Sequence, residues 1–143
     1  MAVVLASAGG LAGAVQAAVM GELGDRVGIV PAVALSVIVS LACGLVALVV
    51  WEHGFGGVRA ALHEPAWLWI GGVMSVFIVF AITVGPPRIG VTATVATVIA
   101  GNLVSAAVID RFGLFGVERV GLNWTRVLGF ALLALGAALT LKR

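Results

Sequence analysis

Long apolar stretches, separated by short polar links, run along the whole chain. Each is close to the roughly 20 residues that an α-helix needs to cross a bilayer. None shows the polar–apolar alternation that a membrane β-barrel requires. Helices satisfy their own backbone hydrogen bonds in lipid, so we predict an all-α integral membrane protein with a single domain over residues 1–143. Its five transmembrane helices are expected at about residues 3–20, 29–51, 66–85, 91–109 and 124–141.

Charged residues gather in the links between these stretches, and only Arg126 enters one, near its start. The pattern avoids the roughly 2.5–3.5 kcal/mol that a charge costs at the centre of a spanning helix. Pro31 and Pro65 stand where helices begin, which is where the missing N–H of proline matters least. The run Gly85-Pro86-Pro87 is expected to end the third helix sharply. Tryptophans lie near the span ends, as an interfacial aromatic belt predicts: Trp51, Trp67, Trp69 and Trp124.

Composition agrees with this interpretation. Of the 143 residues, 62% are hydrophobic and 10% are charged, whereas a soluble domain has about 25% charged residues. So few charges cannot cover a water-facing surface, which excludes a soluble enzyme, a nucleic-acid-binding domain and a disordered tail. The one cysteine, Cys43, excludes a disulfide scaffold. Membrane lipid is therefore the expected surrounding of the chain, with no nucleic-acid partner.

The orientation of the chain is not decided by its positive charges. Five spans divide the eight Lys/Arg residues evenly, four on each side of the membrane. Since an excess of Lys/Arg in cytoplasmic loops normally sets orientation, we expect insertion in both directions. A single orientation chosen by the first helix or by a partner is the alternative. The two groups are Arg59, Arg111, Arg119 and Arg126 on one side, and Arg26, Arg88, Lys142 and Arg143 on the other.

Two opposite copies can pair as an antiparallel dimer with a two-fold axis in the membrane plane. Many transporters have this inverted-repeat geometry, with a site near the midplane. Helix packing in lipid uses small residues, and Gly129 and Gly136 lie seven residues apart on one face of the last stretch. We therefore predict that these glycines form a dimer interface, although packing within one subunit would use them equally well.

A few polar residues interrupt the spans. Gln16 and Asn102 carry amide groups that lipid cannot satisfy, so they are expected to face the protein interior or a wet cavity. Ser40 and Ser105 complete the set of predicted substrate contacts. Hydrogen bonding between helices is the alternative for the amides. For serine and threonine, bonding to their own backbone is the favoured interpretation.

No carboxylate is predicted inside a span. Glu22 is placed beyond the end of the first helix, and Asp110 is expected to anchor a helix end or to pair with a basic side chain. A proton-coupled cation antiporter usually needs a buried carboxylate. The predicted cavity is therefore neutral and polar, and suits uncharged, zwitterionic or aromatic solutes.

Metal and enzyme chemistry have little support in the sequence. His53 and His63 lie ten residues apart in one link, with no cysteine or spaced carboxylates around them. No nucleophile–base pattern, phosphate-binding loop or cofactor motif is present. We therefore expect no enzyme activity, no metal site and no cofactor.

Several segments together resemble the YdcZ family of the drug/metabolite transporter superfamily. The resemblance covers nearly the whole chain, and the block in the fourth span is its most specific part. The chain has Met20, Asn102 and Gly121 where the family usually has Asn, Gln and often Pro. The matching segments are QAAVMGELG at 16–24, SLACG at 40–44, WLWIGG at 67–72, AGNLVS at 100–105, IDRFGLFG at 109–116 and RVLG at 126–129.

The resemblance implies a five-helix half of a ten-helix transporter of the inner membrane. Superfamily members are built from inverted halves, either fused or as antiparallel dimers. In the dimeric small multidrug transporters a pair of glycines seven apart in the last helix supports dimerisation, and Gly129 and Gly136 look similar. Those relatives couple protons through a first-helix glutamate, and this chain has Gln16 in that region.

These observations predict a small-molecule transporter subunit that works by alternating access as an antiparallel pair. The partner is a second copy or a related five-helix chain. A non-transporting subunit that assembles or regulates a partner is the alternative. A channel is disfavoured, because neither a ring of charges nor a carbonyl filter is evident.

Overall fold

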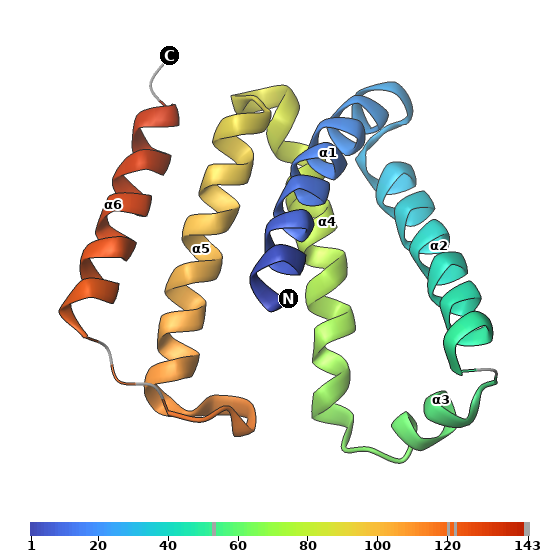
Figure 1. Cartoon of the computed structure of the whole chain (residues 1–143). Coiled ribbons are helices and arrows are strands. Elements are labelled where there is room, and N and C mark those ends of the chain that lie inside the picture. The colour runs from blue at the N-terminus through green and yellow to red at the C-terminus, as the bar shows by residue number, and fades with distance from the viewer. Residues whose placement is uncertain (53, 120, 122, 142–143) are drawn as a thin grey trace. The chain divides into compact units, whose positions relative to one another are not determined.

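A computed structural model describes residues 1–52, 54–119, 121 and 123–141. Within these residues the chain is helical and contains no strand. Five helices are long and apolar enough to cross a membrane, at residues 2–27, 29–52, 66–89, 91–112 and 124–141. The predicted fold class, an all-α integral membrane protein with five spans, is confirmed. The elements (Figure 1) are α1 (Ala2–Val27), α2 (Ile29–Ala47), η1 (Leu48–Glu52), α3 (Gly56–Ala61), η2 (Ala66–Trp69), α4 (Ile70–Ile89), α5 (Val91–Phe112), η3 (Leu114–Gly116) and α6 (Trp124–Leu141).

The ends of the helices correct the predicted boundaries. Helix α1 continues past Met20 to Val27, so the first link shrinks to Gly28 alone. Helix α5 continues past Ile109 to Phe112, and the second span ends in a turn of π-helix, η1. Charged residues do not stop these helices, because a side chain at a membrane surface keeps its charge in water while the backbone bonds continue. The last span, α6, begins and ends where it was predicted.

The prediction that residues 85–87 end the third span is wrong. Helix α4 runs through both prolines to Ile89. The proline ring holds φ near the helical value, so a last turn can form even though the proline nitrogen donates no hydrogen bond. The N–H of Gly90 then bonds the Pro86 carbonyl at 2.9 Å and closes that turn.

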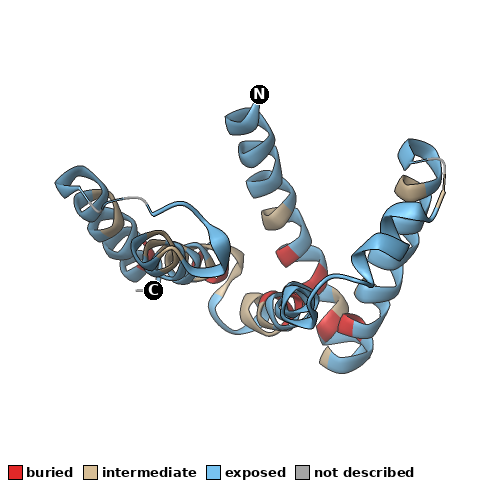
Figure 2. Cartoon of the chain, turned by 90° about the horizontal axis from the view of Figure 1, so that it is seen from below, coloured by how far each residue is buried: buried red, intermediate tan, exposed pale blue. Residues whose placement is uncertain are grey.

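Contacts divide the chain into two compact units. The first unit, as named here, consists of residues 19–84, and the second unit consists of residues 1–18 and 85–143. The prediction of a single domain therefore stays a prediction. Buried residues are few in either unit (Figure 2). The small core of the first unit consists of Met20, Ala32, Val33 and Val79, with Leu23 and Ile29 packed against it.

Two close approaches between helices depend on glycine. In the first unit, a Cβ on Gly24 of α1 would lie 2.7 Å from Thr83 Cγ2 on α4. In the second unit, a Cβ on Gly85 would overlap the side chain of Thr94 on α5. Thr83 and Thr94 are both buried. These pairs are the small-residue packing that membrane helices use in place of a hydrophobic driving force.

Helices α5 and α6 lie side by side as a hairpin within the second unit (Figure 1). Their connection contains Gly113, which caps α5 in the left-handed conformation (φ 65°, ψ 38°) and bonds the Ile109 carbonyl at 2.8 Å. Such a cap ends a helix without steric strain only when the residue has no Cβ. The chain then passes through η3 and turns back to Asn123, which precedes α6.

Candidate functional site

The four predicted substrate contacts lie on three helices, and all are exposed in the single chain. Gln16 lies on α1, Ser40 on α2, and Asn102 and Ser105 on α5. Asn102 and Ser105 are three residues apart and so lie on neighbouring positions of one helix face. Within the described part of the chain, no hydrogen bond engages any of the four side chains. Their role in binding a substrate stays a prediction.

The hydroxyl groups of several threonines behave differently. The Oγ1 atoms of Thr83, Thr94 and Thr97 donate to the carbonyls four residues earlier, at 2.7 Å, 2.8 Å and 2.8 Å. The expectation that hydroxyls bond their own helix is confirmed for Thr94 and Thr97. The side-chain amides of Gln16 and Asn102, in contrast, are bulky polar groups within the spans, and no described residue forms a hydrogen bond with them.

An unsatisfied amide matters more in a membrane than in water. Moving an amide into an apolar surrounding without a hydrogen-bond partner costs roughly 2–7 kcal/mol, depending on the reference state. Gln16 and Asn102 therefore need a partner that the described residues of this chain do not supply. A substrate, water in a cavity or a polar group of a second chain would each supply it.

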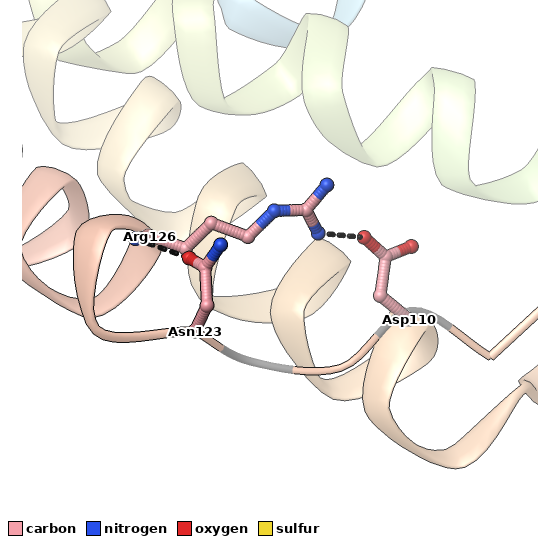
Figure 3. A network of polar contacts seen from close by, with 3 residues as sticks. All are labelled: Asp110, Asn123 and Arg126. Atoms are coloured by element: carbon pink, nitrogen blue, oxygen red, sulfur yellow. Dashed lines mark hydrogen bonds and ion pairs between the residues drawn. The ribbon is translucent and has the colours of Figure 1, made fainter.

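The polar contacts at the start of α6 involve three residues (Figure 3). The Asn123 side-chain oxygen accepts the backbone N–H of Arg126 at 3.0 Å and so caps α6. Arg126 Nη1 lies 3.4 Å from Asp110 Oδ2 on α5. Both charged side chains are more than a third exposed, so the pair adds little to stability. It confirms that Asp110 pairs with a basic side chain.

Glu22 requires a correction. It lies inside α1 and not beyond the end of the first helix. Its Oε1 is 2.7 Å from Arg26 Nη2, and both side chains are well exposed. A carboxylate and a guanidinium four residues apart meet on one helix face. The first span therefore carries a carboxylate near one end, paired within its own helix.

An apolar groove of about 560 Å³ lies between α2 and α4 in the first unit. None of the four predicted polar contacts lines it. Sequence reasoning missed this groove, since its lining residues resemble every other apolar position of the spans. They are Val30, Val33, Ala34, Val37, Ile38, Val76 and Phe80.

The predicted dimer glycines lie on an open face of α6. A Cβ on Gly129 or on Gly136 would meet no atom within 4 Å. The described residues thus leave this face uncovered, which is compatible with an interface to another chain. The interface itself stays a prediction.

No group of three or more His, Cys, Asp or Glu among the described residues could hold a metal ion. Of the two histidines considered for metal, His53 lies outside the described residues, as do Lys142 and Arg143 of the charge count.

A comparison with protein families matches residues 1–139 to the family described as "Putative inner membrane exporter, YdcZ". The chain belongs to the YdcZ family. This family is of the drug/metabolite transporter type, which confirms the resemblance in the sequence. With five spanning helices in the structure, this YdcZ protein is a multi-pass protein of the inner membrane.

The YdcZ description, that of an exporter, indicates membrane transport and not catalysis. A comparison with curated proteins finds no match, and a comparison with solved structures finds none either.

Proposed function

We propose that this YdcZ protein is one half of a transporter that works by alternating access as an antiparallel dimer. The observation that carries the proposal is the pair of amides, Gln16 and Asn102, exposed on apolar helices with no partner in the described chain. A second chain would enclose them in a pathway between the two subunits. The open Gly129–Gly136 face of α6 would lie against that second chain.

The substrate we propose is a small neutral, zwitterionic or aromatic compound. Of the acidic side chains within the described spans, Glu22 and Asp110 are each paired with an arginine, and Asp25 and Glu52 lie in the last turns of their spans. A pathway lined by amides and hydroxyls offers hydrogen bonds but no net charge to hold a compact cation. Ser40 and Ser105 would add hydroxyl contacts to those of Gln16 and Asn102.

The test is transport by the purified chain in proteoliposomes, using a panel of labelled neutral, zwitterionic and aromatic solutes. We expect the wild-type chain to move at least one class, and Gln16→Ala and Asn102→Ala to lower its rate by roughly tenfold or more, the factor expected for a lost hydrogen bond of about 1–2 kcal/mol. Controls on the same helices are Ser7→Ala and Thr97→Val, whose hydroxyls bond their own backbone. Both controls should transport normally.

The alternative is a non-transporting subunit that assembles or regulates a partner chain. The same unpartnered amides favour it, because any second chain could satisfy them. It predicts no flux of any solute by this chain alone and a stoichiometric partner after mild purification. Normal transport by both amide variants would instead show that the proposed contacts are wrong.

A further inference from the structure

The connection between α5 and α6 holds two arginines around one cavity. Arg111 lies in the last turn of α5, and Arg119 lies in the segment that leads to α6. Together with Phe112 and Gly121 they line a cavity of about 330 Å³. The two arginines lie eight residues apart in the chain.

Gly113 allows this arrangement. A Cβ on Gly113 would lie 2.7 Å from Arg119 Cγ and 3.2 Å from its Nε. Only because position 113 has no side chain can the Arg119 stem fold back over the end of α5. The positive φ of Gly113 (65°) makes the same demand on the backbone.

Neither arginine is neutralised within the described chain. Of the two nearby acidic residues, Asp110 is engaged by Arg126 at 3.4 Å. Glu118 forms no ion pair with Arg111 or Arg119 in the described residues. The cavity therefore presents two uncompensated cations. An arginine fork binds the oxygens of a phosphate in a fixed geometry.

The surroundings of the cavity indicate where its anion comes from. It lies at the end of α5, a helix long and apolar enough to cross a membrane. The ends of such helices are expected at the depth of the lipid headgroups. Phe112, which lines the cavity, is 62% exposed, and Leu114, two residues further along the chain, is 42% exposed. An anion with an attached hydrocarbon chain meets both features, and basic pockets at this depth are known to take acidic headgroups.

We propose that Arg111 and Arg119 bind the phosphodiester of an anionic phospholipid, with Phe112 and Leu114 against its acyl chains. This site is independent of the proposed transport pathway, because it shares no residue with it. A bound lipid would hold the α5–α6 connection in one leaflet and so position the start of α6.

Native mass spectrometry of the full chain in detergent, titrated with phosphatidylglycerol, tests the proposal. We expect saturable binding, and about tenfold weaker binding in Arg111→Gln and in Arg119→Gln, as for one lost charge-assisted hydrogen bond. Arg59→Gln is the matched control, since Arg59 also lines a cavity with apolar residues but has no second arginine there. It should bind like the wild type.

Two further arms decide the source of the anion and the role of charge. Phosphatidylcholine should bind to the wild type about as weakly as phosphatidylglycerol binds to the glutamine variants. Inorganic phosphate at millimolar concentration should not displace phosphatidylglycerol from the wild type. Displacement would assign the site to a free anion and overturn the lipid proposal. If a glutamine variant unfolds, the double variant Arg111→Lys with Arg119→Lys takes its place. It keeps both charges but lacks the guanidinium fork, so it should bind phosphatidylglycerol more weakly than the wild type does. Equal binding of phosphatidylglycerol to the wild type and to a folded double glutamine variant would also overturn it.

Discussion

Gly85 illustrates how a single residue decides the approach of two helices. Its missing side chain leaves room for Thr94, whose hydroxyl donates to the Gly90 carbonyl at 2.8 Å. Thr94 is 3% exposed, so it has little space into which it can move. The glycine and the threonine therefore constrain one another.

We expect Gly85→Ala to lower the free energy of unfolding by about 1–3 kcal/mol, the usual range for overpacking. Gly72→Ala on the same helix is the control, because its Cβ would meet no atom within 4 Å. It should have no effect or a small stabilising one. Unfolding by SDS in mixed micelles, followed by circular dichroism, measures both variants. Equal stabilities of the two variants would contradict the close packing of Gly85 on Thr94.

At the scale of the elements, two helix corners are alike. Gly28 joins α1 to α2 with φ 92° and ψ 155°, and Gly90 joins α4 to α5 with φ 85° and ψ 159°. Each N–H bonds the carbonyl four residues earlier, and each carbonyl accepts the N–H four residues later. The sequences Arg26-Val27-Gly28-Ile29 and Arg88-Ile89-Gly90-Val91 correspond position by position. Two helix-to-helix connections of the chain thus have the same one-residue corner.

This corner conformation belongs to a region of φ/ψ space that essentially only glycine enters, at a cost of about 1–3 kcal/mol for other residues. We expect Gly28→Ala and Gly90→Ala each to lose stability of that size. Gly44→Ala in α2 and Gly101→Ala in α5 are the controls, since both sites are helical and open. The same SDS titration compares them. A corner variant as stable as its control would contradict the corner geometry.

On the scale of the whole molecule, ion pairing leaves the charge balance unchanged. Arg26, of one predicted group of four, is paired with Glu22, and Arg126, of the other group, is paired with Asp110. Removing one arginine from each group of four leaves three against three. The expectation of insertion in both directions therefore does not depend on whether paired arginines are counted.

Labelling with an impermeant thiol reagent tests this in intact cells. With Cys43 replaced, Asp25→Cys at the end of α1 and Glu64→Cys in the second link report opposite sides. We expect about half of the molecules of each cysteine variant to react in intact cells, and the other half to react only after lysis, since the charge rule favours neither direction. All-or-none labelling would establish a fixed orientation and direct the search to an oppositely inserted partner chain.

A matched pair of variants sharpens this experiment. Arg88→Gln leaves an excess of cations on the side of the second link, so labelling at Glu64→Cys should fall. Arg59→Gln removes a cation from the side of the second link, so the excess lies on the other side and labelling at Glu64→Cys should rise. If neither variant changes the labelled fraction at Glu64→Cys, the equal number of Lys/Arg on the two sides does not determine the orientation.

The sequence alone determined the number of spans, the fold class and the family. These depend on the transfer free energy of each segment and on local motifs, which are properties of residues close together in the chain. It also indicated that the hydroxyls of Thr94 and Thr97 bond their own helix. The ends of α1, α4 and α5 differ from the predicted ones because neither charged residues nor proline stop these helices.

Only the tertiary structure decided which residues meet. Asp110 pairs with Arg126 sixteen residues later, and Arg119 folds over Gly113 beside Arg111. The apolar groove between α2 and α4 likewise depends on how two helices are rotated about their axes. Helix rotation and chain reversal are set by packing between segments, and uniformly apolar helices carry almost no periodic signal from which a sequence could predict them.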